Sequence, residues 1–242
     1  MSFWPYYGLK QGIQTTPWPD GEDLSPGLSP GRPLSAPVTA PEATAALCPV
    51  GALQARAEGV HVAFDRCIHC QRCRQGEHAL PWQEDFAWTV AAANNQGPLG
   101  GRFYESLNVL YVDAGACGAC VNEVRLIDAP AYNLHRLGIF VTATPRDADV
   151  LLVAGPITDA MRTAIRKAYA AMPEPKRVVG MGVCAVNGGI FGESFACAGG
   201  LEKIVPVDWW IPGCPPPPLA ILQGLLRVVG RAVPQMTEEG TP

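Results

Sequence analysis

The sequence has few charged residues and no long apolar run. Charged residues make up 17% of its 242 positions. No stretch of about 20 consecutive apolar residues occurs, so we expect no transmembrane helix. The net charge of −4 argues against nucleic acid as the main ligand. The first residues lack a basic stretch followed by an apolar one, so no export signal is expected. The apolar content of 48% suffices for one α/β core with an appendage.

The sequence is instead rich in cysteine, with nine in total. Without an export signal, these cysteines are better interpreted as metal ligands than as disulfides. Eight of them form two groups of four, and the ninth, Cys197, matches neither group. We expect Cys197 to be a free, buried thiol, which is common for cysteine.

The first group lies in the stretch CPVGALQARAEGVHVAFDRCIHCQRC, which begins at Cys48. Two short alternating segments around an Ala-Glu-Gly turn predict a hairpin here. The stretch resembles half of a bacterial two-cluster ferredoxin, whose repeat is C-x2-C-x2-C-x3-C-P, with the fourth cysteine serving the other cluster. The second repeat's triplet corresponds to Cys67, Cys70 and Cys73, and the end of the first repeat corresponds to Cys48.

The departures from that repeat concern one cluster only. The repeat would place the four ligands of the other cluster at positions 38, 41, 44 and 77. None of these positions is a cysteine; they are Val38, Pro41, Thr44 and Glu77. The resemblance therefore implies one complete [4Fe-4S] cluster, with Zn²⁺ as the alternative because four thiolates also suit a tetrahedral ion. His69 lies between these cysteines, and we expect it beside the cluster or facing solvent and not as a ligand.

The second half of the sequence predicts an α/β fold. A helical spacing of apolar residues over 159–172 lies among buried-strand runs, so we expect a parallel sheet with ligands at the carboxyl ends of its strands. The expected strands are 107–113, 138–144, 149–155, 177–183 and 203–208. Another helix is expected from Pro218, because proline suits a first helical turn.

The second group of cysteines follows three of these strands and consists of Cys117, Cys120, Cys184 and Cys214. Glycines beside them either let the backbone approach an inorganic core closely or simply form turns, and the sequence leaves both interpretations open. These glycines are Gly115, Gly118, Gly182, Gly188, Gly189 and Gly213.

Four motifs in order carry a family resemblance over about residues 105–229: GACGACVNE, DADVLLVAGPIT, MPEPKRVVGMGVCAVNGGIFG and IVPVDWWIPGCPPPPLAILQGLL. They resemble the cluster-bearing small subunit shared by respiratory complex I (its B subunit) and membrane-bound group 4 [NiFe]-hydrogenases. The resemblance implies a flavodoxin-like domain whose four cysteines bind a second [4Fe-4S] cluster next to a large partner subunit of the hydrogenase and complex I kind. The C-x-x-C pair followed by Glu123 is typical of the hydrogenase branch, whereas complex I subunits have adjacent cysteines. In addition, GLKQGIQTTPWPDG resembles the start of the ferredoxin subunit of formate hydrogenlyase.

These features predict five segments. They are an extended Pro-rich arm (1–47), a ferredoxin-like α+β segment (48–78), a linker (79–106), the small-subunit-like domain (107–230) and a tail (231–242). The aromatic residues near the start favour docking of the arm, with a disordered tail as the alternative.

Other side chains have weaker signals. Glu123 is a candidate proton relay, or else it caps or pairs at a helix start. His135 is expected at the surface or a helix end. Arg125, Arg136 and Arg146 either line a partner-facing surface or are solvated charges.

Three function classes follow. The first is an electron-relay subunit of a membrane-associated, hydrogenase-type (formate hydrogenlyase-like) oxidoreductase. The second is the equivalent relay in a complex I-type NADH-quinone oxidoreductase, and the third is a non-redox zinc protein. For the first two we expect a peripheral position on the cytoplasmic face of the membrane and no activity in isolation. The expected partners are the large subunit, membrane subunits and a further ferredoxin-like donor, but no nucleic acid.

Overall fold

The computed structural model describes residues 3–21, 23, 25 and 27–231. The expected tail therefore lies, from residue 232 onward, outside the described residues. The helices are α1 (Trp4–Gln11), α2 (Pro41–Ala46), α3 (Ala119–Leu126), α4 (Asp159–Ala171), α5 (Val183–Asn187) and α6 (Pro218–Val229). The strands are β1 (Arg32–Pro33), β2 (Leu53–Arg56), β3 (Gly59–Val62), β4 (Trp82–Gln83), β5 (Val90–Ala91), β6 (Leu107–Asp113), β7 (Ile139–Val141), β8 (Val150–Ala154), β9 (Arg177–Met181) and β10 (Trp209–Ile211).

The large domain is built on a six-stranded sheet with the order β5-β10-β9-β8-β6-β7. Strands β6 to β10 pair in parallel, and β5 adds an antiparallel edge to β10. Numbered along the chain, the parallel strands follow the order 2-1-3-4-5, which is the flavodoxin-like order. The expected α/β fold with a flavodoxin-like sheet is thus confirmed.

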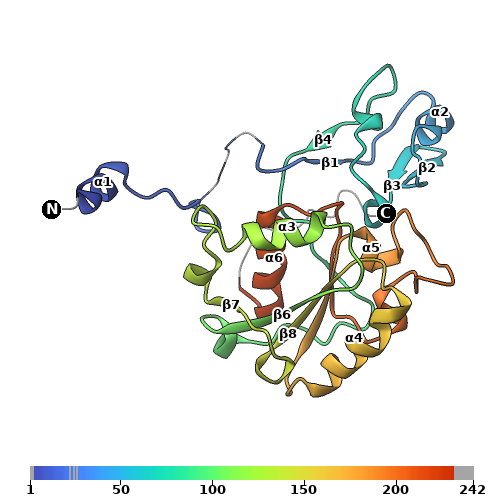
Figure 1. Cartoon of the computed structure of the whole chain (residues 1–242). Helices are drawn as coiled ribbons and strands as arrows, with labels where there is room; N and C mark the ends of the chain where they lie inside the picture. Colours follow the sequence, from blue (N-terminus) through green and yellow to red (C-terminus); the bar gives the residue numbers. More distant parts are fainter. Residues whose placement is uncertain (1–2, 22, 24, 26, 232–242) are drawn as a thin grey trace.

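Helices cover both faces of this sheet (Figure 1). Successive residues of a strand point to opposite faces. Along β8, Val150 and Leu152 lie in the core beneath α3 and α6. The alternating residues Leu151 and Val153 lie in a second core with Ile165 of α4. The sheet is therefore the middle of three layers.

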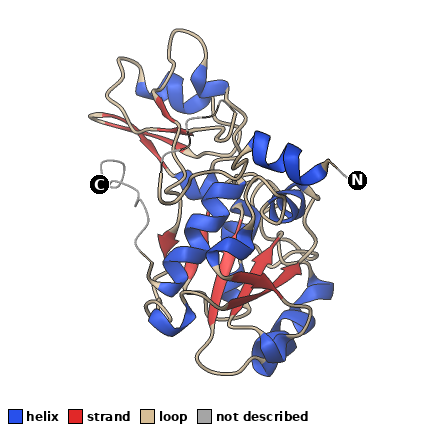
Figure 2. Ribbon diagram, turned by 90° about the vertical axis from the view of Figure 1, so that its left-hand side faces the viewer, coloured by secondary structure: helices blue, strands red, loops and turns tan. Residues whose placement is uncertain are grey.

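A small module stands above the large sheet (Figure 2). Strands β2 and β3 form the expected antiparallel hairpin, with Leu53 opposite Val62, and α2 packs beside it. A separate pair, β1 with β4, joins the N-terminal segment to residues after the hairpin. The ferredoxin-like segment thus contains a hairpin with short helical turns, as an α+β unit requires.

The N-terminal segment differs from an extended arm because it contains α1 and α2. Pro5 and Pro41 lie in the first turns of these helices, where a missing N–H costs nothing. Helix α1 has no buried residue and stands out from the body (Figure 1). The arm does lie over the large domain at Trp18, which is buried in the core. The expected linker also contributes structure, namely β4 and β5.

The fifth strand was expected at 203–208 but lies at Trp209–Ile211. Pro206 lacks a backbone N–H, so the expected run could not pair as a central strand. Asp208 instead receives the N–H groups of Gln96 (3.1 Å) and Val178 (2.9 Å) on its carboxylate, which fixes the start of β10. The cysteine that follows the strand is still brought to the same sheet edge. Across the described part of the chain, no helix has the length and apolar character needed to cross a membrane.

Candidate metal centres

One set of four cysteines gathers at the carboxyl edge of the large sheet. We call Cys117, Cys120, Cys184 and Cys214 the sheet-edge quartet. Cys120 lies in the first turn of α3 after β6, Cys184 lies in the first turn of α5 after β9, and Cys214 follows β10. Because β6, β9 and β10 are parallel, their carboxyl ends meet at one edge. The Asp113 carboxylate shapes the first loop by accepting the N–H groups of Gly115 (2.9 Å) and Ala116 (2.7 Å).

The thiols of this quartet act on one another electrostatically. Burial, followed by smaller effects of Cys184, Cys214 and Cys117, raises the pKa of Cys120 to about 12. Burial likewise raises the pKa of Cys184 to about 11, with contributions from Cys214 and Cys117. The pKa of Cys214 is raised by burial and then by Cys117. Without a bound cation, these three buried or partly buried thiols are protonated at neutral pH, so a metal core that binds them releases protons.

Two glycines beside the quartet leave room for a cysteine sulfur that a Cβ atom would crowd. A Cβ atom at Gly182 would lie 2.9 Å from Cys120 Sγ, and one at Gly189 would lie 2.8 Å from Cys184 Sγ. Both residues have positive φ, 81° and 57°. A side chain at either position would therefore crowd a cysteine sulfur, and a close approach of this backbone to an inorganic core stays a prediction. A Cβ at Gly188 or Gly213 would instead meet backbone atoms of nearby residues, so these two serve tight turns.

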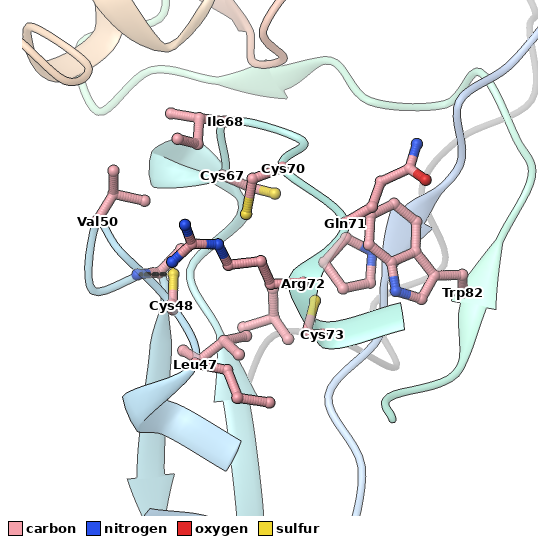
Figure 3. A pocket seen from close by; sticks show the side chains of 14 residues that line it. Leu47, Cys48, Val50, Cys67, Ile68, Cys70, Gln71, Arg72, Cys73 and Trp82 are labelled. Carbon is pink, nitrogen blue, oxygen red and sulfur yellow. Dashed lines mark hydrogen bonds between the residues drawn. The ribbon is translucent and has the colours of Figure 1, made fainter. Parts of the chain in front are cut away.

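The second set, which we call the hairpin quartet, consists of Cys48, Cys67, Cys70 and Cys73. Together with apolar side chains such as Leu47, these thiols line one cavity of the small module (Figure 3). The N–H of Ala52 donates to Cys48 Sγ at 3.2 Å. Burial, with smaller contributions from Cys73, Cys48 and Cys70, raises the pKa of Cys67 to about 12, against a lowering by a backbone hydrogen bond at His69. Burial also raises the pKa of Cys73.

The donor sets suit a metal cluster. All nine cysteines are free thiols, and each quartet contains four thiols, the number of ligands that a [4Fe-4S] cluster needs. Within the described residues, no group of three or more His, Cys, Asp or Glu side chains is arranged so that it could hold a metal ion. That these eight cysteines are ligands stays a prediction.

His69 is partly buried. The expectation that its side chain faces solvent is therefore wrong. Its ring stacks on Trp88, with centroids 5.1 Å apart, and burial lowers its pKa to about 4. Its Nδ1 accepts the N–H of Cys214 at 3.3 Å. In a second link, Asn187 Nδ2 donates to the carbonyl of Asp65 at 2.9 Å. The two quartets therefore lie next to each other. The sequence did not predict this, because each of the two hydrogen bonds joins residues more than a hundred positions apart.

Glu123 lies beside the sheet-edge quartet. Burial raises its pKa, and its charge in turn raises the pKa of Cys120. It is in the second turn of α3, so it does not cap the helix start. Its role as a proton relay stays a prediction.

The remaining candidates lie outside both quartets. Cys197 is buried, as expected, and is the weakest of the groups that raise the pKa of Cys184. His135 lies at the surface, where it pairs with Asp128 at 3.2 Å. Arg136 donates to the Trp18 carbonyl and so holds the N-terminal arm. Arg125 and Arg146 are both exposed.

Comparison with known proteins addresses the large domain. Residues 117–228 match the family model described as the 20 kDa subunit of NADH ubiquinone oxidoreductase, that is, of respiratory complex I. Over 128 residues the chain is 44% identical to an uncharacterized protein of Methanocaldococcus jannaschii, covering 53% of this chain and 86% of that protein. The chain belongs to this complex I subunit family. It is also 41% identical over 129 residues to formate hydrogenlyase subunit 7 of Escherichia coli, covering 53% of this chain and only 51% of that protein.

Two solved structures give further likenesses. The archaeal membrane-bound sulfane sulfur reductase has 31% identity and a TM-score of 0.47, covering 55% of this chain and 76% of the other. The [NiFeSe] hydrogenase of Desulfovibrio vulgaris Hildenborough has 18% identity and a TM-score of 0.35, covering 47% and 56%.

Membership of this family confirms the resemblance predicted from the motifs. The chain is a subunit of an oxidoreductase complex, and its family binds iron-sulfur clusters. The matched residues contain the whole sheet-edge quartet, from Cys117 to Cys214. The hairpin quartet lies outside the residues that the family model matches.

Proposed function

We propose that this chain relays electrons between two [4Fe-4S] clusters in a membrane-associated, hydrogenase-type oxidoreductase of the formate hydrogenlyase kind. The hairpin quartet binds one cluster and the sheet-edge quartet binds the other. The observation that carries the proposal is the junction of the two quartets, where His69 beside Cys70 accepts the N–H of Cys214. Two sites that touch through their own ligand loops suit electron exchange better than two independent structural metals do.

The residues present fit such clusters. Four cysteine thiolates are the usual ligands of a [4Fe-4S] cluster, and a bound cluster supplies reversible one-electron chemistry. This chain's part is to hold the thiols and to exclude water: Cys67, Cys73 and Cys120 are buried, and Gly182 and Gly189 let the backbone lie against sulfur. Hydrogen bonds and solvent access around the sulfurs then set the potential. We take residues 48–78 and 107–230 as the two cluster-bearing domains.

The hydrogenase branch is favoured over complex I by the first cysteine pair. Cys117 and Cys120 are separated by two residues and followed by Glu123, and formate hydrogenlyase subunit 7 is among the relatives. We assign Glu123 the role of a proton relay beside the sheet-edge cluster. Burial raises the pKa of Glu123, and its charge raises the pKa of Cys120. A quinone-reducing complex of the complex I type is the alternative.

The partner-facing surface lies next to the sheet-edge quartet. The loop after Cys184 exposes Ile190, Phe191 and Phe195, the last at 99%. A group of exposed apolar side chains is typical of a protein interface. We assign this loop to the large partner subunit, with membrane subunits of the same complex holding the assembly at the cytoplasmic face.

Metal analysis of the complex that copurifies anaerobically with the full chain tests this proposal. Nickel in a ratio of about one per complex, together with iron, supports the hydrogenase type. Iron without nickel moves the assignment to a quinone-reducing or nickel-free relative, with the relay retained. Zinc in place of iron refutes the relay itself.

A further inference from the structure

We infer that His69 is a positioning residue that couples the two clusters by holding the Cys214 loop against the hairpin quartet. The inference rests on the proposed function, because it concerns how the two sites communicate. It assigns a role to a side chain that is not a ligand in either quartet.

The contact between the quartets is direct. Cys70 is joined to His69 by one peptide bond, and His69 Nδ1 accepts the backbone N–H of Cys214 at 3.3 Å. A route from one ligand to the other thus runs through bonded atoms and crosses a single hydrogen bond. Electrons tunnel more readily along bonded atoms than across a gap, so this route couples the clusters.

The imidazole is fixed in place by aromatic neighbours. It stacks on Trp88 with a tilt of 14°, and Phe64 lies edge-on at 5.5 Å. Trp88 is fully buried, and its Nε1 donates to Asp85 at 2.8 Å. Asp85 in turn pairs with the buried Arg32 at 3.0 Å. The ring therefore stays aligned with Cys214 instead of rotating between rotamers.

The backbone of His69 is also unusual. Its φ is +52°, in the left-handed region that residues other than glycine seldom adopt. This costs energy and persists only where the surroundings impose it. Here it accompanies a side chain that leaves its own ligand loop and reaches the other quartet.

The hydrogen bond also occupies the Cys214 amide. Hydrogen bonds near cluster sulfurs help to set the reduction potential. Because the Cys214 N–H donates to His69, removing the acceptor frees a donor on the same residue that carries the ligand sulfur. The structure assigns His69 two linked effects, on the rate of exchange between clusters and on the environment of the Cys214 cluster.

His69→Phe tests this in the full chain, purified anaerobically with its partners. It keeps an aromatic ring but removes the acceptor, whereas His69→Gln retains a side-chain acceptor. We expect His69→Phe to keep the wild-type iron content and both reduced-cluster signals. Its Cys214 amide should exchange hydrogen at least tenfold faster, and electron equilibration between the clusters should slow at least tenfold. On a logarithmic scale, His69→Gln should show at most half of each change seen in His69→Phe. The control His78→Phe should change neither the amide exchange of Cys214 nor the electron equilibration.

If His69→Phe changes neither the hydrogen exchange of the Cys214 amide nor the electron equilibration between the clusters, the inference is overturned. The two proposed clusters would be unaffected by that result. If that variant loses iron, amide exchange is compared between the cluster-free wild-type and variant chains, with the same tenfold expectation and the same refuting result. A wild-type chain without two clusters would instead refute the proposed function, so the two failures are distinguishable.

Discussion

The contact between Gly189 and Cys184 gives a sharp test of the sheet-edge site. A Cβ atom at Gly189 would lie 2.8 Å from the Cys184 sulfur, whereas one at Gly192 would meet no atom within 4 Å. The two glycines lie in the same loop and have nearly equal φ, +57° and +61°. Gly189→Ala and Gly192→Ala therefore carry the same backbone cost, about 1–2 kcal/mol each. They differ in the contacts with Cys184, whose sulfur would lie at 2.8 Å and whose backbone N and Cα would lie at 3.3 Å from the new methyl group.

The size of the displacement follows from ordinary contact distances. Non-bonded atoms at optimal separation lie about 3.5–4.0 Å apart, so Gly189→Ala must move the Cys184 sulfur by about 1 Å. A ligand displaced this far no longer meets its iron. We expect Gly189→Ala to hold about four irons per chain and Gly192→Ala to hold about eight, as in two complete clusters.

Iron and acid-labile sulfide per chain are measured on the two variants, together with thermal unfolding of each. Both variants should lose stability through the backbone effect, and any further loss in Gly189→Ala comes from the contact with Cys184 and from the missing cluster. Full iron in Gly189→Ala, equal to that in Gly192→Ala, would show that the sheet-edge site does not depend on where the loop holds this sulfur.

Three further predictions concern other residues. Glu123→Gln should slow turnover of the assembled complex while leaving the cluster signals intact, because it removes a titratable group but no ligand; unchanged turnover would exclude the relay. Cys197→Ser should retain all iron, since Cys197 belongs to neither quartet, and a loss of iron would make it a ligand. The cluster-free chain should lose stability as pH rises from about 9 toward 12, because the folded pKa values of Cys67 and Cys120 are about 12 against an ordinary 9.0. A raised folded pKa gives stability that is complete below the unfolded value and disappears above it, by up to about 4 kcal/mol per thiol. Denaturant unfolding under reducing conditions measures this, and a stability that is level across that range would contradict the shifts.

Local signals were enough for the regular parts of the fold. The helical spacing around Ile165 predicted α4, and Pro218 correctly marked the start of α6. The hairpin of β2 and β3 followed from alternation around a short turn. These patterns depend on neighbours in sequence, which is why a single chain reveals them.

Elements that depend on distant partners were missed. Strand β5 has two residues and exists because it pairs with Trp209 and Trp210. The position of β10 depends on Asp208, which binds the backbone of other segments. The junction at His69 joins residues 145 positions apart, so spacing could place His69 among the cysteines of one site but not beside the other.

One measurement tests directly whether the two cysteine quartets hold two redox clusters. Iron, sulfide and zinc are counted in the anaerobically purified chain, and electron paramagnetic resonance is recorded after reduction, for the wild type, Cys48→Ser and Cys214→Ser. We expect about eight irons per chain and two reduced signals in the wild type, and each variant should lose a different one of the two signals. Stoichiometric zinc with no reducible signal, or the loss of both signals in each single variant, would contradict this expectation.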